Sequence, residues 1–250
     1  LTVSSALQAQ TIEVITNGDF GASTAGYTSG YSYASAQNSL FGANEGKYGI
    51  GASPNYFHSN FIKSLAPAAG APAPAATQAM IVNGYATIDS WVWAEPVQLT
   101  AGVPYSFSGW ATSVLSAANP TFNNAVPHLQ VRMTPAPISP APVDCSAVAT
   151  AAASSSANIA ALQSVVNINP PPLALYVPPP PPANQAADVN AAPAWTQGTA
   201  TVTPTATGTY CLMVFNVMAA GGIRQGNDFA MTGLSLTATK PVAVNDPYTT

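Results

Sequence analysis

The sequence predicts an all-β fold, a jelly-roll β-sandwich of roughly eight to ten strands. Three observations lead to this prediction. Short stretches in which apolar and polar residues alternate recur along the chain, as they do in half-buried strands. At 48% hydrophobic residues, the 250-residue chain has enough apolar surface for one large core. Only one stretch, rich in alanine, has the composition of a helix.

The central stretch, Ser90–Thr112, reads as two strands, Trp91–Leu99 and Tyr105–Thr112, joined by a turn. Three of the four tryptophans of the chain lie here. Trp91 and Trp93 share one face by spacing, so both are expected in the core or both at the surface. Tryptophans on strands usually pack between sheets, which favours the core.

Further strands are expected on both sides of this stretch, from their alternation, β-branched residues or bounded apolar runs. In the last of them, the apolar residues keep one inward face only if Gly233 marks a β-bulge. The expected strands are Thr11–Thr16, Gln78–Asn83, Pro127–Thr134, Trp195–Thr203, Thr209–Val217 and Asp228–Thr239.

The segment 135–194 is expected to be one Pro/Ala-rich insertion within a sandwich that spans residues 11–239. It holds thirteen of the 24 prolines and lacks the spaced apolar pattern that a separate core requires. Ala147–Asn167 is alanine-rich enough for a helix, although Val165 and Val166 disfavour one. The proline runs at 170–172 and 178–182 predict polyproline II.

Charged residues are unusually few, five Lys or Arg and nine Asp or Glu. Such a surface tolerates packing against copies of itself, because few ions need to be desolvated. The five basic residues are scattered singly, which argues against a nucleic-acid partner. No apolar run is long enough to predict a transmembrane helix.

The two ends and the two cysteines carry further expectations. Residues 1–10 read either as the remnant of a signal peptide or as an extended arm that adds to the sheet edge of a neighbour. Export would favour a disulfide between Cys145 and Cys211, and two buried thiols are the alternative. The spacing of cysteines and histidines predicts no metal site.

Six short motifs, in chain order, carry a resemblance to a known group. They are Asn17–Phe20 (NGDF), Glu45–Tyr48 (EGKY), Met80–Gly84 (MIVNG), the strand around Trp93, Trp195–Gln197 (WTQ) and Asn227–Ala230 (NDFA). With them the chain resembles the galactose-binding-like jelly rolls related to bacterial carbohydrate-binding modules, which occur on large secreted and surface proteins. The tail, 240–250, is similar to the opening of cadherin-like surface repeats and is expected to be a tail or linker.

The resemblance implies a structural calcium as the one candidate cofactor, with Asn17, Asp19 and Asp228 as its ligands. The paired acids that usually follow in the last strand are replaced here by Thr232 and Gly233, which removes a ligand.

Catalysis is not expected. Sugar hydrolysis needs two carboxylates within about 10 Å, whereas Asp89 and Glu95 lie about 20 Å apart along a straight strand. No Gly-x-Ser-x-Gly motif precedes a helix. Sugar binding is the alternative, with aromatic platforms drawn from Trp91, Trp93, Tyr85 and Trp110.

The sequence therefore predicts a secreted, non-catalytic subunit of a surface filament, layer or matrix, which associates with copies of itself. A carbohydrate-binding module for a cell-wall or matrix polysaccharide is the alternative function.

Overall fold

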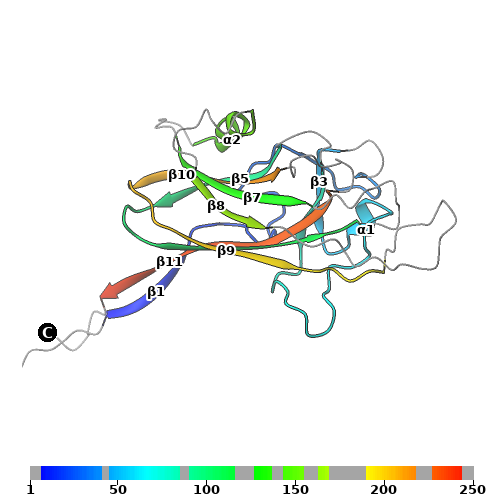
Figure 1. Ribbon diagram of the computed structural model, residues 1–250, viewed down its shortest axis with the longest axis horizontal. Coiled ribbons are helices and arrows are strands. Elements are labelled where there is room, and N and C mark those ends of the chain that lie inside the picture. Colours follow the sequence, from blue (N-terminus) through cyan, green and yellow to red (C-terminus); the bar gives the residue numbers. More distant parts are fainter. Residues whose placement is uncertain are drawn as a thin grey trace, which may run out of the picture.

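The computed structural model describes residues 7–40, 45–84, 90–115, 127–136, 143–154, 163–168, 190–217 and 227–243. Within these ranges the chain forms two β-sheets packed face to face, with two short helices (Figure 1). The elements are β1 (Leu7–Glu13), β2 (Ser32–Tyr33), β3 (Lys47–Gly51), α1 (Pro54–Phe57), β4 (Ala79–Asn83), β5 (Ser90–Leu99), β6 (Tyr105–Ser113), β7 (His128–Pro135), α2 (Cys145–Ser154), β8 (Gln163–Ile168), β9 (Thr196–Val202), β10 (Gly208–Val217) and β11 (Phe229–Ala243).

The strand order confirms the predicted jelly roll. The first sheet has the order β2-β3-β4-β11-β6-β9, with β1 paired to β11 at the side, and the second has the order β5-β10-β7-β8. From β4 onward the chain crosses between the sheets at nearly every connection, and only β7 and β8 follow each other in one sheet. The strands β4, β6, β9 and β11 of the first sheet thus alternate along the chain with β5, β7, β8 and β10 of the second. This arrangement of two four-stranded sets is that of a jelly roll.

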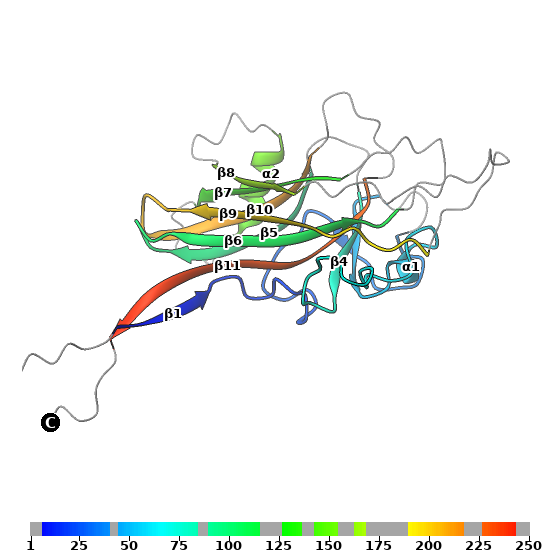
Figure 2. The same cartoon turned by 60° about the horizontal axis from the view of Figure 1, so that its bottom comes forward.

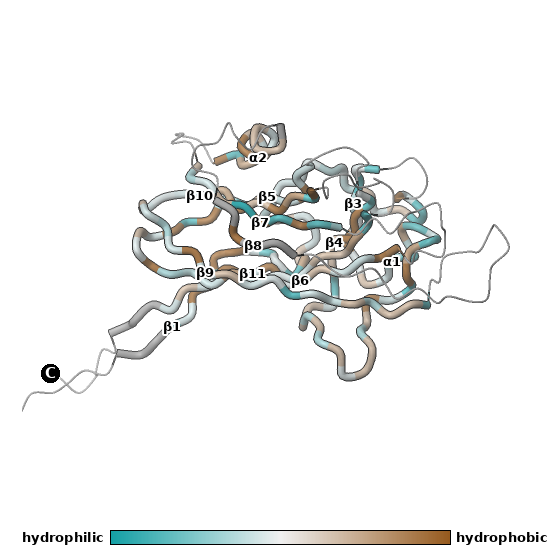
Figure 3. Tube along the Cα trace, in the orientation of Figure 1, coloured by the Kyte–Doolittle hydropathy of each residue, from teal (hydrophilic) through white to brown (hydrophobic). Residues whose placement is uncertain are grey.

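The main core lies between the two sheets. Along β6, Tyr105, Phe107 and Ala111 are buried in this core, while Ser106 between them is exposed. The same alternation of hydrophobic and hydrophilic positions runs along other strands (Figure 3). Each fully buried aliphatic or aromatic side chain contributes about 2 kcal/mol relative to its exposed state, so this core is the main source of stability.

The prediction that Trp91 and Trp93 share one face is wrong. Both side chains are buried, but Trp93 lies in the core between the sheets and Trp91 packs on the outer face of the second sheet. The cause is a bulge: Trp93 pairs with Val214 and Trp91 with the next residue, Phe215, so Val92 is an extra residue in β5. One extra residue reverses the alternation of faces beyond it.

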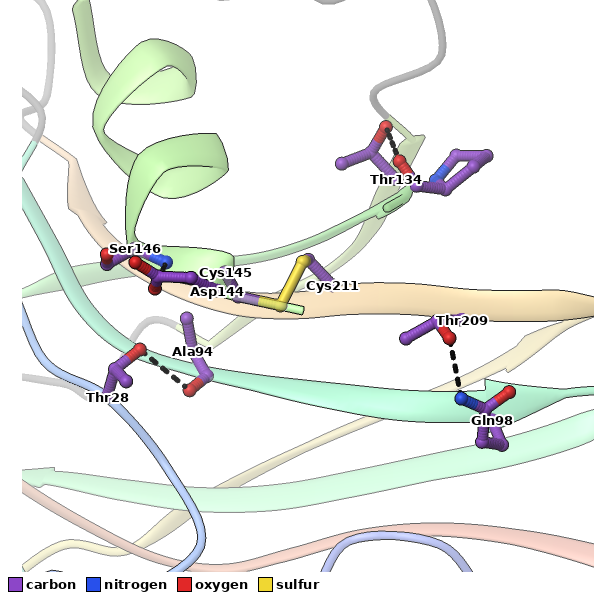
Figure 4. Close-up of a disulfide and its surroundings, with 10 residues drawn as sticks. Thr28, Ala94, Gln98, Thr134, Asp144, Cys145, Ser146, Thr209 and Cys211 are labelled. Atoms are coloured by element: carbon purple, nitrogen blue, oxygen red, sulfur yellow. Dashed lines mark hydrogen bonds between the residues drawn. A yellow bond between two sulfur atoms is a disulfide. The ribbon is translucent and has the colours of Figure 1, made fainter. Parts of the chain in front are cut away.

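Helix α2 covers the outer face of the second sheet at Trp91. A disulfide joins Cys145, at the start of α2, to Cys211 in β10 (Figure 4). The helix buries Ala149 and Ala152 against the sheet, and Thr150 accepts a hydrogen bond from the Trp91 indole at 3.2 Å. The disulfide thus holds a small second core on this face.

The expected helix over Ala147–Asn167 is only partly present. The helix is confined to Cys145–Ser154, and Gln163–Ile168 is instead β8, an edge strand of the second sheet that pairs with β7. The β-branched pair Val165-Val166 accounts for the difference, because such side chains favour strands. The proline runs at 170–172 and 178–182 lie outside the described residues.

The bulge expected at Gly233 is confirmed. The register between β11 and β6 shifts between Thr232 and Ser235, and Gly233 has a φ of +62°. A side chain at this position would be strained and would meet the Trp110 indole at 3.2 Å.

Candidate functional site

The most prominent feature outside the sandwich is a two-stranded ribbon, formed by β1 and by residues Thr237–Ala243 at the end of β11. The two strands are antiparallel, from Leu7 opposite Ala243 to Glu13 opposite Thr237. Figures 1 and 2 both show them projecting beyond the two sheets. Of the expected arm 1–10, the described part, residues 7–10, pairs with β11 of its own chain.

Glu13 anchors the base of the ribbon. Its Oε1 accepts hydrogen bonds from the backbone N–H groups of Val14, Ile15 and Leu236, and its Oε2 accepts one from the Ser235 hydroxyl. Carboxylates that accept several such bonds form strong, directional contacts. The ribbon is therefore fixed to the body where it leaves the first sheet.

Thr16 ties the chain beyond β1 to the second sheet. Its backbone N–H and its hydroxyl both donate to Oε1 of Glu95, each at 2.8 Å. Glu95 is buried, and its Oε2 has no hydrogen-bond partner among the described residues. Burial raises the pKa of the Glu95 carboxyl, and the Thr16 hydrogen bonds partly oppose that shift.

The direction of the backbone groups in the ribbon follows from one hydrogen bond. Val14 donates its N–H to the carbonyl of Leu236 at 3.0 Å, so every second pair from there, such as Gln10 with Lys240, is hydrogen-bonded between β1 and β11. The intervening residues Leu7, Ala9 and Thr11 direct their N–H and C=O groups outward. No other described strand pairs with this outer edge of β1.

The opposite edge of the ribbon is chemically different. The last residue of β11 that pairs with β6 is Ala238, opposite Tyr105. Beyond it, the backbone groups that point away from β1 belong to Thr239, Pro241 and Ala243. Pro241 has no N–H, so the middle of this edge lacks a donor. Proline on an edge strand discourages the addition of a further strand. The ribbon thus has one open edge and one blocked edge.

The three tryptophans of the alternative sugar site do not form one surface. Trp91 lies under α2, Trp93 is fully buried between the sheets, and Tyr85 lies outside the described residues. Trp110 is half-buried on the outer face of the first sheet and packs beside the cluster around Trp195. The three tryptophan side chains belong to separate layers of the sandwich, so they provide no shared platform.

The three residues expected to bind calcium are not brought together. The Asn17 amide donates to the carbonyls of Ser23 and Ala25 and accepts from the N–H of Ala22, so it serves the loop that follows β1. The backbone carbonyl of Gly18, which lies between Asn17 and Asp19, accepts a hydrogen bond from the N–H of Leu234. Asp228 lies six residues before Leu234 in the chain, which corresponds to about 20 Å along an extended strand. Calcium ligands lie within about 2.6 Å of one ion. A calcium held by all three side chains does not fit this arrangement.

Asp228 has a structural environment instead. It is buried at the start of β11, and its Oδ1 accepts the N–H of Gly84 at 2.8 Å. Burial raises the pKa of Asp228 to about 7; the negative charge of Glu45 adds to the shift, and the Gly84 hydrogen bond opposes it. Within the described part of the chain, no group of three or more His, Cys, Asp or Glu residues is arranged to hold a metal.

A cavity of about 360 Å³ lies on the outer face of the first sheet. The loop containing Leu65 and Pro74 forms one wall, and Trp195 and Thr232 form another. The Trp195 indole donates to the carbonyl of Leu65 at 3.0 Å, which holds the loop against the ring. The Thr232 hydroxyl donates to the carbonyl of Gln78 at 2.7 Å. The lining is mostly alanine and proline, with few polar groups.

Two of these features were not expected from the sequence. The ribbon joins segments more than 200 residues apart; the expected strand Thr11–Thr16 and the extended arm 1–10 overlap β1, but neither indicates its pairing partner. The cavity is formed by the Ala/Pro loop 65–77, which reads as low complexity; Trp195 at the start of an expected strand was the one available signal.

No family model and no curated protein matches the chain. Among solved structures, it is similar to the N-terminal endo-1,4-β-D-xylanase 10B of Clostridium thermocellum, CBM22-1 and GH10 modules in complex with xylohexaose. The match has 12% identity and a TM-score of 0.36, and it covers 99% of this chain and 30% of that chain. The chain therefore spans less than a third of the length of that protein. The strand order of the chain itself defines its class, an all-β jelly-roll sandwich.

No described helix is long and apolar enough to cross a membrane.

Proposed function

We propose that this chain is a non-catalytic extracellular subunit of a surface filament, layer or matrix, and that it has a structural or adhesive role. The observation that carries the proposal is the β1/β11 ribbon, which extends from the sandwich and has an open backbone edge on β1. An edge of unpaired N–H and C=O groups is a template for another chain. The two sheets of a jelly roll are complete without a projecting ribbon, so the fold itself does not require this one.

The low charge of the chain supports self-association. With five basic and nine acidic residues, close contact between copies requires the desolvation of few ions. Part of that charge is already engaged within the fold: Glu95 and Asp228 are buried, and Glu13 accepts four hydrogen bonds at the base of the ribbon.

The disulfide supports an extracellular location. Disulfides persist in oxidising compartments and are rare in the cytosol. The Cys145–Cys211 bond pins α2 onto the second sheet, and the structure has no free cysteine in its described ranges.

A role without catalysis is supported by the placement of the buried carboxylates. Glu95 accepts from Thr16, and Asp228 accepts from Gly84. Neither carboxylate lines the cavity beside Trp195. General acid and base groups have to reach a bound substrate, and neither of these carboxylates is at the border of that cavity.

A second candidate function is the binding of a cell-wall or matrix polysaccharide. One observation favours it: the cavity of about 360 Å³ beside Trp195 is large enough for a sugar ring and has the Thr232 hydroxyl and Gln78 at its border. Under this function Trp195, and not the central tryptophans, provides the aromatic wall.

The two functions differ in their response to concentration and to polysaccharide. We expect static light scattering to show association that rises with protein concentration, and negative-stain microscopy to show fibres or sheets. Retention of a dispersed monomer on insoluble cell-wall polysaccharide, lost in a Trp195→Ala variant that keeps its melting temperature, would instead establish the second function.

A further inference from the structure

We propose that the outer edge of β1 pairs with the outer edge of β1 in a second copy of this chain. The two strands run antiparallel and are related by a two-fold axis beside Ala9. This inference rests on the proposed self-association and names one contact within it, the contact that pairs two copies. The product is a continuous four-stranded sheet, in the order β11-β1-β1-β11, that joins two sandwiches.

The backbone geometry of β1 carries the first step. Leu7, Ala9 and Thr11 direct their N–H and C=O groups away from β11, as the pairing from Val14–Leu236 onward requires. None of the three is proline, so each offers one donor and one acceptor. An exposed edge with this regular spacing pairs with a strand of the same spacing.

The choice between the two edges of the ribbon is the second step. The β11 edge has Pro241 in its middle, which has no N–H, so this edge lacks a donor there. The β1 edge has no such obstacle. Association through the ribbon is therefore expected on the β1 side only, which produces a closed pair of chains from this contact.

The choice of a second copy as the partner is the third step. Pairing of Ala9 with Ala9 of the second copy sets Leu7 opposite Thr11, so the edge is complementary to itself. Residues Leu7–Ile12, which include every residue of the Leu7–Thr11 pairing, carry no charge. Like charges directly opposite each other would oppose pairing, and this register has none. It provides roughly six backbone hydrogen bonds.

The shape of the chain permits this arrangement. Because the ribbon projects from the body, a second ribbon can lie beside it (Figure 2). Antiparallel pairing puts the base of each ribbon near the tip of the other. The two Glu13 residues are then separated by eight residue steps, about 27 Å along the strands. The two sandwiches lie at opposite ends of the shared sheet.

The first experiment removes the outward N–H of Ala9 without removing a bond to β11. In an Ala9→Pro variant, the ribbon keeps its own ladder, because Ala9 is in a pair that is not hydrogen-bonded to β11. Both N–H groups beside the two-fold axis are lost at once, so we expect association to weaken by about 30-fold or more in analytical ultracentrifugation. The matched Ala9→Val variant keeps the N–H and is expected to associate like the wild type.

The second experiment tests the register by cross-linking. The two Ala9 Cα atoms would be about 5.5 Å apart, a distance that a disulfide spans. An Ala9→Cys variant is therefore expected to form a covalent dimer under mild oxidation. In the control variant, Thr11→Cys, the two introduced thiols belong to residues about 14 Å apart, and no dimer is expected. The native cysteines already form a disulfide and do not compete.

The outcomes separate this inference from the proposed function. If Ala9→Pro associates as strongly as the wild type, the β1 edge is not the interface, while self-association still stands. A covalent dimer of Thr11→Cys without one of Ala9→Cys refutes the two-fold axis beside Ala9. A wild-type chain that stays monomeric at millimolar concentration refutes both the proposed function and this inference.

Discussion

Two groups whose pKa values are shifted by burial are expected to make opposite contributions to stability as the pH changes. Burial raises the pKa of Asp228 to about 7, and burial lowers the pKa of His58, which stacks on Phe61, to about 4. The folded chain holds the Asp228 proton more tightly than the unfolded chain, so this contribution is largest at low pH and is lost as the pH rises through 7. The folded chain holds the His58 proton less tightly, so its contribution is present above pH 6.5 and is lost as the pH falls toward 4.

The two contributions are of similar size. With a pKa of about 7 for Asp228 in the folded chain and 3.8 in the unfolded chain, the free energy of unfolding is about 2.5 kcal/mol higher at pH 5 than at pH 8 from this group alone. With a pKa of about 4 for folded and 6.5 for unfolded His58, the free energy of unfolding is about 2 kcal/mol lower at pH 5 than at pH 8. The contributions of Asp228 and His58 to the stability of the wild type thus nearly cancel over this range. Glu95, whose pKa is also raised, acts in the same direction as Asp228.

Two variants separate these contributions. Asp228→Asn keeps an acceptor for the Gly84 N–H but does not titrate, so between pH 5 and pH 8 its free energy of unfolding should rise by about 2.5 kcal/mol relative to that of the wild type. His58→Asn keeps an acceptor for the Asn60 N–H and should show the opposite slope. Urea unfolding at pH 5, 6, 7 and 8 measures each difference, in which the Glu95 contribution cancels. If the Asp228→Asn and wild-type curves stay parallel, Asp228 is not titrating as its burial requires.

Three further predictions concern stability. Replacing both Cys145 and Cys211 by Ser removes a cross-link between residues 66 positions apart, and chain entropy predicts a loss of about 4 kcal/mol in urea unfolding; an unchanged midpoint would contradict that expectation. Gly18→Ala places a Cβ 1.7 Å from the Leu234 carbonyl oxygen, so the melting temperature should fall sharply. The control variant Gly21→Ala should have little effect, because the nearest contact of its Cβ is the Asp19 side chain at 3.3 Å. Above pH 7, Glu95→Gln should be tolerated, because the Gln side chain still accepts the Thr16 hydrogen bonds. Glu95→Ala cannot accept them and should lower the free energy of unfolding by about 2 kcal/mol. Equal losses in the two variants would show that the bonds to Thr16 do not contribute to stability.

The strands and the jelly roll were predictable because they depend on local alternation. Tyr105, Phe107 and Ala111 face the core as their spacing indicates, and the bulge at Gly233 follows from the apolar pattern around it. The opposite placement of Trp91 and Trp93 was not predictable. Val92 becomes an extra residue only through its position opposite Val214 and Phe215 in β10, which lies more than 100 residues away.

The candidate site depends on contacts that the sequence does not display. LQAQTIE shows a strand pattern, but its pairing with the end of β11 depends on a register across the whole chain. Asn17, Asp19 and Asp228 lie in motifs that resemble those of calcium-binding modules. The distance of Asp228 from the other two is set by the length of β11 between Asp228 and Leu234, which the motifs do not show. The cavity beside Trp195 requires the fold of the Ala/Pro loop, which has no periodic pattern.

The antiparallel ribbon also determines how the chain responds to tension. Leu7 and Ala243 are neighbours at its tip, so a force that pulls these two residues apart acts on one backbone pair at a time and opens the ribbon like a zipper. Sequential opening occurs at lower force than shearing, in which all pairs carry the load together. The Glu13 carboxylate, with its hydrogen bonds to Leu236 and Ser235, marks the point where this opening reaches the sandwich. In single-molecule extension experiments, the ribbon should therefore lengthen first, as a reversible mechanical buffer that protects the core.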